Sequence, residues 1–227
     1  MSTADLVIHY AEQFYQNLRK DEHSQDRSWE HCYKASHDAR QVPEPDYDYL
    51  SPHLAFYLAS WGMYHGSSFL TQKDYRMDSP VVQELLDSRY DCLFGLECED
   101  LRKPEIQQAL VSLESFMERY YEGVRNSCKG PVNSRISVTL ITKILIGTLG
   151  CVPAYDKYFT ERIRSQKTAS GTYGISSLLC LANFYEENYE KLEKTRENFK
   201  VYDLNYPQMK ILDMGFFGIG LACEQNK

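Results

Sequence analysis

Residues 104–121, PEIQQALVSLESFMERYY, contain the most regular hydrophobic pattern in the chain. Apolar side chains recur there at intervals of four and three residues, which matches the 3.6-residue turn of an α-helix. They are Ile106, Leu110, Leu113, Met117 and Tyr120. Pro104 suits the first turn of a helix, where its missing N–H has no intrahelical partner to lose. The segment therefore predicts an amphipathic helix that begins at Pro104 and buries one face.

The segments on both sides show similar signals. Helices are predicted to begin at Thr3, near Arg27, at Ser51-Pro52 and at Ser79-Pro80, and then after Pro153, Ser176 and Pro207. Residues 134–149, SRISVTLITKILIGTL, contain many β-branched side chains, which favour a strand. Because the segment is longer than an ordinary strand, we assign a helix to it. The sequence thus predicts an all-α fold, an irregular or orthogonal array of about nine helices with no strand.

Two further expectations concern the organisation of the chain. The helix from Ser51 is apolar on all sides, which is typical of a buried helix, so we expect it at the centre of the core. We expect a single helical domain over residues 1–227, with the turn CKGPVN at 128–133 as the candidate for a subdomain boundary.

Composition excludes several classes of protein. With 43% hydrophobic and 25% charged residues, the chain can bury a core and is not expected to be disordered. Its seven cysteines form no C-x-x-C pair, which argues against a zinc ribbon and favours a reducing cytoplasm. We find neither a secretory leader nor a run of about 20 apolar residues. We therefore expect a cytoplasmic protein with no membrane contact and no cofactor; the oligomeric state is left open.

Charge is distributed unevenly along the chain. The net charge is −7, yet residues 119–167 hold nine basic and three acidic residues, so this segment carries +6 and the remainder −13. A basic segment of this kind is a candidate surface for DNA. It is equally consistent with a solvated face that balances acidic helices elsewhere in the fold.

The familiar catalytic motifs are absent. The sequence contains no G-x-G-x-x-G and no G-x-x-x-x-G-K-[ST], so it has no recognisable nucleotide-binding loop. It also lacks H-E-x-x-H and G-x-S-x-G, which excludes the common zinc-protease and α/β-hydrolase patterns.

One segment does suggest chemistry. Residues 139–163, TLITKILIGTLGCVPAYDKYFTERI, place Lys143 in an apolar helix, followed by a loop with Pro153 and Asp156 and then a further helix. This arrangement resembles part of the helix-hairpin-helix DNA glycosylase superfamily. The resemblance implies that Asp156 matches the catalytic aspartate and that Lys143 lies near the nucleophilic lysine of the bifunctional members. The glycine hairpin of that family is missing, with Val138-Thr139-Leu140-Ile141 in its place.

The implied reaction is the cleavage of a nucleobase from its sugar. A carboxylate stabilises the oxocarbenium character that develops and helps to activate water, whereas a lysine amine forms a Schiff base. Five residues are candidates for a substrate pocket, three because they are aromatic and two because they are charges in an apolar helix. They are Trp61, Tyr64, Tyr155, Lys210 and Asp213.

Two other functions compete with this reading. The chain could be a non-enzymatic helical module that binds a protein partner through tyrosine-rich or acidic surfaces, which predicts a contiguous exposed apolar patch. It could also be a histidine-dependent nuclease or small-molecule enzyme built around His31, His53 and His65. A structural reading is available for Asp156 as well, since a carboxylate in the first turn of a helix complements the helix dipole.

Overall fold

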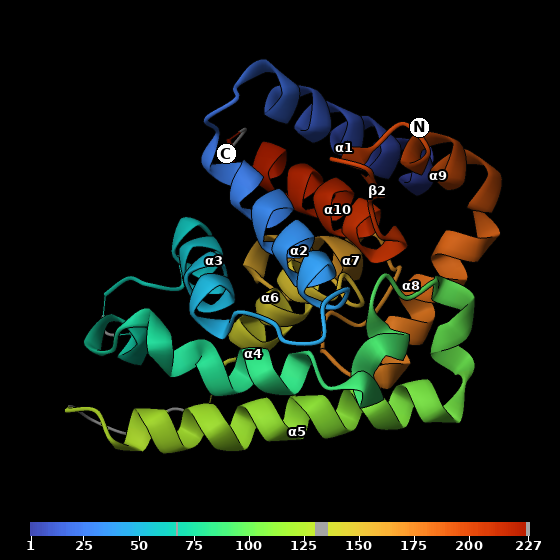
Figure 1. Cartoon of the computed structure of the whole chain (residues 1–227). Coiled ribbons are helices and arrows are strands. Elements are labelled where there is room, and N and C mark those ends of the chain that lie inside the picture. The colour runs from blue at the N-terminus through green and yellow to red at the C-terminus, as the bar shows by residue number, and fades with distance from the viewer. Residues whose placement is uncertain (67, 130–135, 226–227) are drawn as a thin grey trace.

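The computed structural model describes residues 1–66, 68–129 and 136–225 (Figure 1). Its α-helices are α1 (Thr3–Lys20), α2 (Ser28–Ala39), α3 (Tyr47–Ser60), α4 (Ser79–Leu85), α5 (Pro104–Asn126), α6 (Val138–Thr148), α7 (Lys157–Ser165), α8 (Ile175–Glu187), α9 (Tyr189–Arg196) and α10 (Gln208–Gln225). Short 3-10 helices connect some of them: η1 (Gln25–Arg27), η2 (Phe69–Gln72), η3 (Tyr75–Asp78), η4 (Ser88–Leu93) and η5 (Cys98–Arg102).

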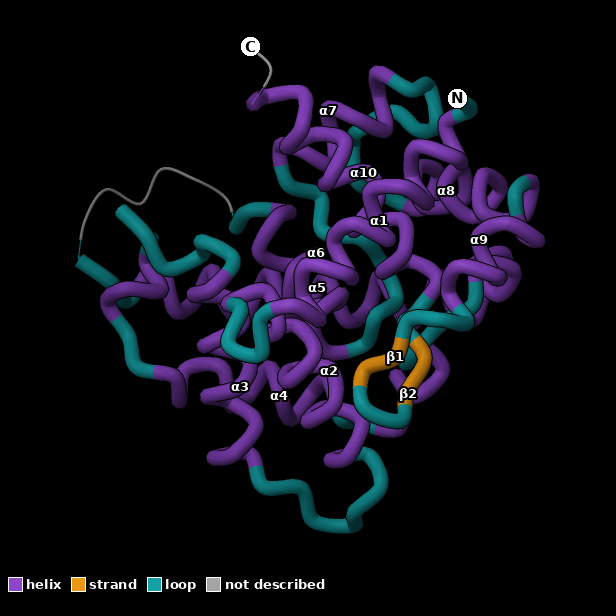
Figure 2. Tube along the Cα trace, turned by 90° about the horizontal axis from the view of Figure 1, so that it is seen from above, coloured by secondary structure: helices purple, strands orange, loops and turns teal. Residues whose placement is uncertain are grey.

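The all-α class predicted from the sequence is confirmed. Over the described residues the chain forms ten α-helices rather than about nine, and one small hairpin was missed. In this hairpin β1 (Lys200–Val201) pairs antiparallel with β2 (Leu204–Asn205). Figure 2 shows how small the hairpin, drawn in orange, is beside the helices. Strands of two residues are too short to produce an alternating hydrophobic pattern.

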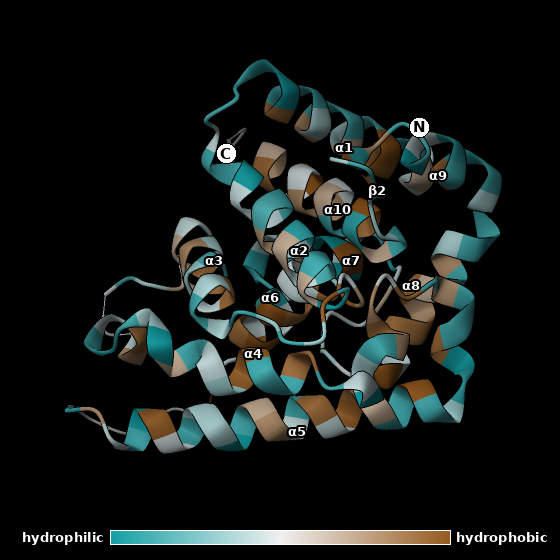
Figure 3. Cartoon of the chain, in the orientation of Figure 1, coloured by the Kyte–Doolittle hydropathy of each residue, from teal (hydrophilic) through white to brown (hydrophobic). Residues whose placement is uncertain are grey.

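Helix α5 follows the sequence prediction closely. It begins at Pro104, and its buried side chains are those of Ile106, Leu110, Leu113, Met117 and Tyr121. The stripe therefore ends at Tyr121 rather than at Tyr120. Figure 3 shows the resulting alternation of hydrophilic and hydrophobic residues along this helix.

Helix α3 differs from the expectation in two ways. It begins at Tyr47, because the side chain of Asp46 caps it by accepting a hydrogen bond of 3.0 Å from the N–H of Tyr49. It is also not buried on all sides, since Tyr49 is 58% exposed and Phe56 is 62% exposed. The prediction that this helix forms the centre of the core was therefore wrong. The expected helix 176–199 is likewise divided, at Asn188, into α8 and α9.

The most deeply buried helices are α6 and α10. Every residue of α6 from Leu140 to Thr148 is buried. Helix α10, red in Figure 1, packs against α1 and α7. Its close approach to α1 depends on Gly215, where a Cβ atom would lie 2.5 Å from Cγ1 of Val7 and 2.6 Å from the Val7 carbonyl oxygen. These contacts hold α1 and α7 against α10.

The hydrophobic core is a single cluster that includes side chains from both halves of the chain, from Val7 to Ile219. The candidate subdomain boundary at 128–133 lies mostly outside the described residues, since 130–133 are not among them. In the described part of the chain, no helix is both long and apolar enough to cross a membrane.

Candidate functional site

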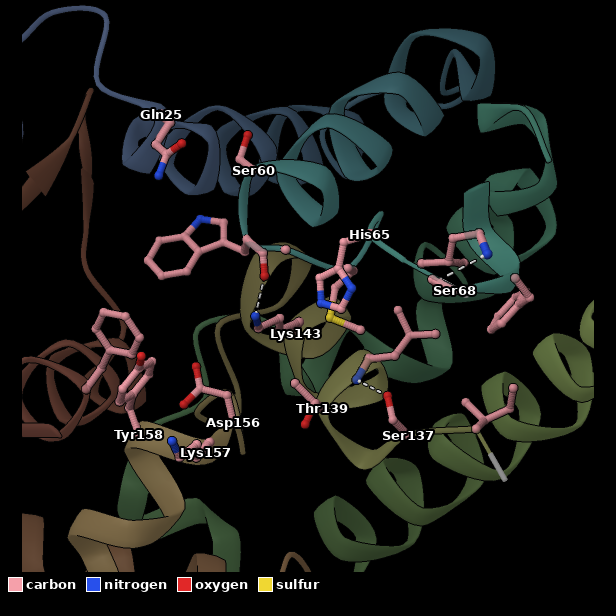
Figure 4. A pocket seen from close by; sticks show the side chains of 18 of the residues that line it. Gln25, Ser60, His65, Ser68, Ser137, Thr139, Lys143, Asp156, Lys157 and Tyr158 are labelled. Atoms are coloured by element: carbon pink, nitrogen blue, oxygen red, sulfur yellow. Dashed lines mark hydrogen bonds between the residues drawn. The ribbon is translucent and has the colours of Figure 1, made fainter. Parts of the chain in front are cut away.

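A cavity of about 1070 Å³ opens where α1, α6, α7, α10 and the end of α3 meet. Its charged lining residues are four cations and two carboxylates, namely Arg125, Lys129, Lys143, Lys157, Asp26 and Asp156. Figure 4 shows Lys143 and Asp156 projecting into this space, with Gln25 and Ser60 on another side of it. A volume of this size accommodates a small organic ligand.

One wall of the cavity is aromatic. Phe14 and Trp61 are stacked with their ring centroids 6.3 Å apart, and Trp61 meets Phe217 edge to face at 5.7 Å. Tyr158 then meets Phe217 edge to face at 5.5 Å. The four rings come from α1, the end of α3, α10 and α7, so the tertiary packing assembles the wall. Aromatic faces of this kind stack with planar ligands.

Lys143 is a buried cation in an otherwise apolar helix. Ser137 caps α6 by accepting a hydrogen bond from the N–H of Leu140 at 3.1 Å, and Lys143 follows in the second turn with only 6% of its surface exposed. Its Nζ donates a hydrogen bond of 2.6 Å to the carbonyl oxygen of Trp61. Burial lowers the pKa of this amine, because the charged form loses hydration. A neutral amine is nucleophilic, so the environment favours the reactive form.

Asp156 combines a structural role with a place in the cavity. Its Oδ1 accepts a hydrogen bond of 3.0 Å from the N–H of Phe159 and so caps α7. Burial raises the pKa of this carboxyl group, and Asp213 raises it further, whereas the Phe159 N–H and Lys143 act in the opposite direction. The helix begins at Lys157 rather than after Pro153, so Asp156 is its N-cap and not a residue of its first turn as expected, and the same residue lines the cavity.

The loop before Asp156 is fixed to α6 and α10 by hydrogen bonds. Oγ1 of Thr142 accepts the N–H of Tyr155 at 2.9 Å, and Oδ1 of Asp213 accepts the N–H of Ala154 at 2.9 Å. Because Thr142 directly precedes Lys143 and Tyr155 directly precedes Asp156, these bonds fix the position of Asp156 relative to Lys143.

Two of the predicted pocket residues lie outside the cavity lining, behind the aromatic wall. Lys210 and Asp213 form a buried ion pair with Nζ and Oδ2 2.8 Å apart. The ammonium of Lys210 also lies 5.4 Å from the Trp61 ring centroid and 4.9 Å from that of Trp29. The pair thus supports the wall and the loop and does not itself line the cavity.

Of the three aromatic residues predicted for the pocket, one lines the cavity and two do not. Trp61 lines the cavity. The hydroxyl of Tyr155 bonds to Oγ of Ser177 at 2.8 Å in the core, so it does not line the cavity. Tyr64 also lies outside the lining; burial, together with Asp78, raises the pKa of its hydroxyl.

The three candidate histidines do not share one site in the cavity. His65 lines it, but Nδ1 of His31 bonds to the hydroxyl of Tyr202 at 2.9 Å and Nδ1 of His53 lies 2.8 Å from the carbonyl oxygen of Tyr49. Among the described residues, no group of three or more His, Cys, Asp and Glu side chains could hold a metal ion.

The basic segment 119–167 contributes three cations to the cavity besides Lys143. Of these, Arg125 pairs with Glu122 at 3.1 Å and Lys157 pairs with Glu224 at 3.0 Å. Arg135, which belongs to the same segment, lies outside the described residues. The segment therefore does line a ligand-sized space, although part of its charge is balanced locally.

Sequence reasoning missed several cavity residues. They are Phe14, Asn17, Gln25, Asp26 and Phe217. None belongs to a recognisable motif, and they come from segments far apart in the chain. No local signal could have grouped them.

Comparisons with known proteins add nothing to this picture. No family model matches the chain, no curated protein matches its sequence, and no solved structure matches it at a significant level.

Proposed function

We propose that this protein is a nucleobase-directed N-glycosidic hydrolase that resembles the helix-hairpin-helix DNA glycosylases, with Lys143 and Asp156 as its catalytic residues. The observation that carries the proposal is that both side chains line one aromatic-walled cavity. Burial lowers the pKa of the Lys143 amine, so this amine gives up its proton more readily, and burial raises the pKa of the Asp156 carboxyl group, so this group takes up a proton more readily.

The proposed reaction uses both groups. The bond between C1′ of the sugar and the base nitrogen breaks, and its electron pair leaves with the base, which takes a proton from solvent. The carboxylate of Asp156 stabilises the positive charge that develops at C1′. The amine of Lys143 forms a bond to C1′ and gives up a proton, which Asp156 accepts. The sugar ring then opens as the bond between C1′ and O4′ breaks: O4′ takes the proton held by Asp156, and a Schiff base remains between Lys143 and C1′. Water hydrolyses this Schiff base, which releases the sugar as an aldehyde and restores the amine of Lys143.

The surroundings fit a nucleotide substrate. A flipped base requires a pocket with aromatic or apolar walls, and the rings of Phe14, Trp61, Phe217 and Tyr158 supply one. The phosphates require cations near the same opening, and Arg125, Lys129 and Lys157 line the cavity. Both features belong to the space that contains Lys143 and Asp156.

The test measures base release and covalent trapping with a panel of duplexes, each with one oxidised, deaminated or alkylated base. Borohydride reduces a Schiff base to a stable amine, so the wild-type protein is expected to form a cross-link to at least one duplex. Lys143→Gln retains a donor near the Trp61 carbonyl oxygen but is expected to abolish the cross-link.

Asp156→Asn separates catalysis from capping, because asparagine caps a helix about as well as aspartate does. Base release is expected to fall by about 100-fold or more while the thermal midpoint stays close to that of the wild type. Asp156→Ala is the matched control, since it removes both the carboxylate and the cap and should cost about 1 kcal/mol of stability. Undiminished release by Asp156→Asn, or no release from any duplex by the wild type, would contradict the proposal.

A further inference from the structure

A second carboxylate, that of Asp26, lines the same cavity but has no part in the proposed reaction. Asp26 lies in η1, which Ser24 begins by accepting the Asp26 N–H on its hydroxyl oxygen at 3.3 Å. This bond fixes the backbone at the position from which the half-buried side chain faces the cavity.

The Asp26 carboxylate has no partner of its own. Within residues 1–66, 68–129 and 136–225, no hydrogen bond or ion pair to its oxygens is formed. These oxygens are also not among the fully buried polar atoms that lack a hydrogen-bond partner. Burial raises its pKa, and the charge of Lys210 opposes that effect. A partly desolvated acceptor without a donor gains a hydrogen bond when a ligand supplies one.

The neighbouring lining residues indicate what kind of ligand supplies that donor. Phe14 and Trp61 offer stacked aromatic faces, and the amides of Asn17 and Gln25 offer further donors and acceptors. A planar heteroaromatic ring stacks with such faces and presents polar groups at its edge. An amino group on that edge donates to a carboxylate, as a cytosine amino group does to aspartate or glutamate.

We propose that Asp26 determines specificity in this cavity by accepting a hydrogen bond from the exocyclic amino group of a nucleobase such as adenine or cytosine. The inference rests on the proposed function, because it concerns the base of the same substrate. A base with an oxo group in that position would direct lone pairs at the carboxylate. Such a base is therefore rejected, since neither group can donate to the other.

The test is calorimetric titration of the protein with free bases in two matched pairs, adenine with hypoxanthine and cytosine with uracil. The members of each pair differ by an amino or an oxo group at the edge. The wild type is expected to bind at least one amino-bearing base about fivefold or more tightly than its oxo partner. Asp26→Asn keeps the shape but adds a donor, so the preference should disappear or reverse.

Asp203→Asn, at a highly exposed position in the hairpin turn, is the matched control and should keep the preference. The proposal is overturned if the wild type binds neither amino-bearing base, if it binds the oxo bases as tightly, or if Asp26→Asn retains the discrimination. Free bases have no glycosidic bond, so the result does not depend on catalysis. A preference for amino-bearing bases without base release from any duplex would contradict the proposed function alone.

Discussion

Asp78→Asn is expected to stabilise the protein at neutral and alkaline pH. Asp78 is fully buried between η3 and α4, and its Oδ1 accepts a hydrogen bond of 2.6 Å from the hydroxyl of Tyr121. Its Oδ2 is buried without a partner, and so is the hydroxyl of Tyr64. Burial raises the pKa of this carboxyl group from 3.8 to about 7, against the lowering effect of the hydrogen bond from Tyr121.

The sign of the pH dependence follows from proton binding. Between about pH 4 and pH 7 the folded state holds a proton on Asp78 that the unfolded state has lost, so stability falls as the pH rises. Each pKa unit corresponds to about 1.4 kcal/mol, so a rise of about three units removes about 4 kcal/mol by pH 8. Asparagine resembles the protonated acid: its carbonyl oxygen can accept from Tyr121, and its amide can donate to the Tyr64 oxygen.

The assay is urea unfolding of both proteins at pH 4, 6 and 8, followed by circular dichroism. The two proteins should be about equally stable at pH 4, and Asp78→Asn should exceed the wild type by about 2–4 kcal/mol at pH 8. The exposed substitution Asp203→Asn should change the free energy of unfolding by no more than about 0.5 kcal/mol at any of these pH values. If Asp78→Asn is less stable than the wild type at pH 8, or if the difference does not depend on pH, the reasoning about Asp78 is refuted.

Two further substitutions test the packing around α10. Gly215→Ala should cost about 1–3 kcal/mol in urea unfolding, because its Cβ would meet the backbone of Val7, whereas Gly123→Ala has open space and should be neutral or stabilising. Equal effects of the two would show that the contact with α1 is not tight. Lys210→Met should cost about 3–5 kcal/mol by leaving Asp213 buried and unpaired, and adding Asp213→Asn should recover part of that loss. A double variant no more stable than Lys210→Met would contradict the ion-pair interpretation.

The two catalytic candidates and the remaining cavity residues differ in how they could be found. Lys143 and Asp156 are thirteen positions apart, within one helix–loop–helix segment, so the sequence could place them together. Asp26 belongs to a short 3-10 turn and Phe217 to the last helix, and only the tertiary structure brings them to the cavity that Lys143 also lines. The same packing directs Lys210 and Asp213 away from the cavity, which their positions in an apolar helix did not reveal.

The sequence by itself determined the helices that carry a strong local signal. The regular stripe of α5 and the apolar run of α6 require burial of a particular face, and proline at the start of α5 sets where it begins. Only the tertiary structure decided which apolar helix became central, because a hydrophobic helix must be buried but its sequence does not specify which other helix it packs against. The small side chain of Gly215 allows α10 to approach α1 closely, and α3 was left at the surface with Phe56 exposed. The cavity exists because helices distant in sequence pack around it. Contacts between residues so far apart in the chain produce no periodic pattern in the sequence.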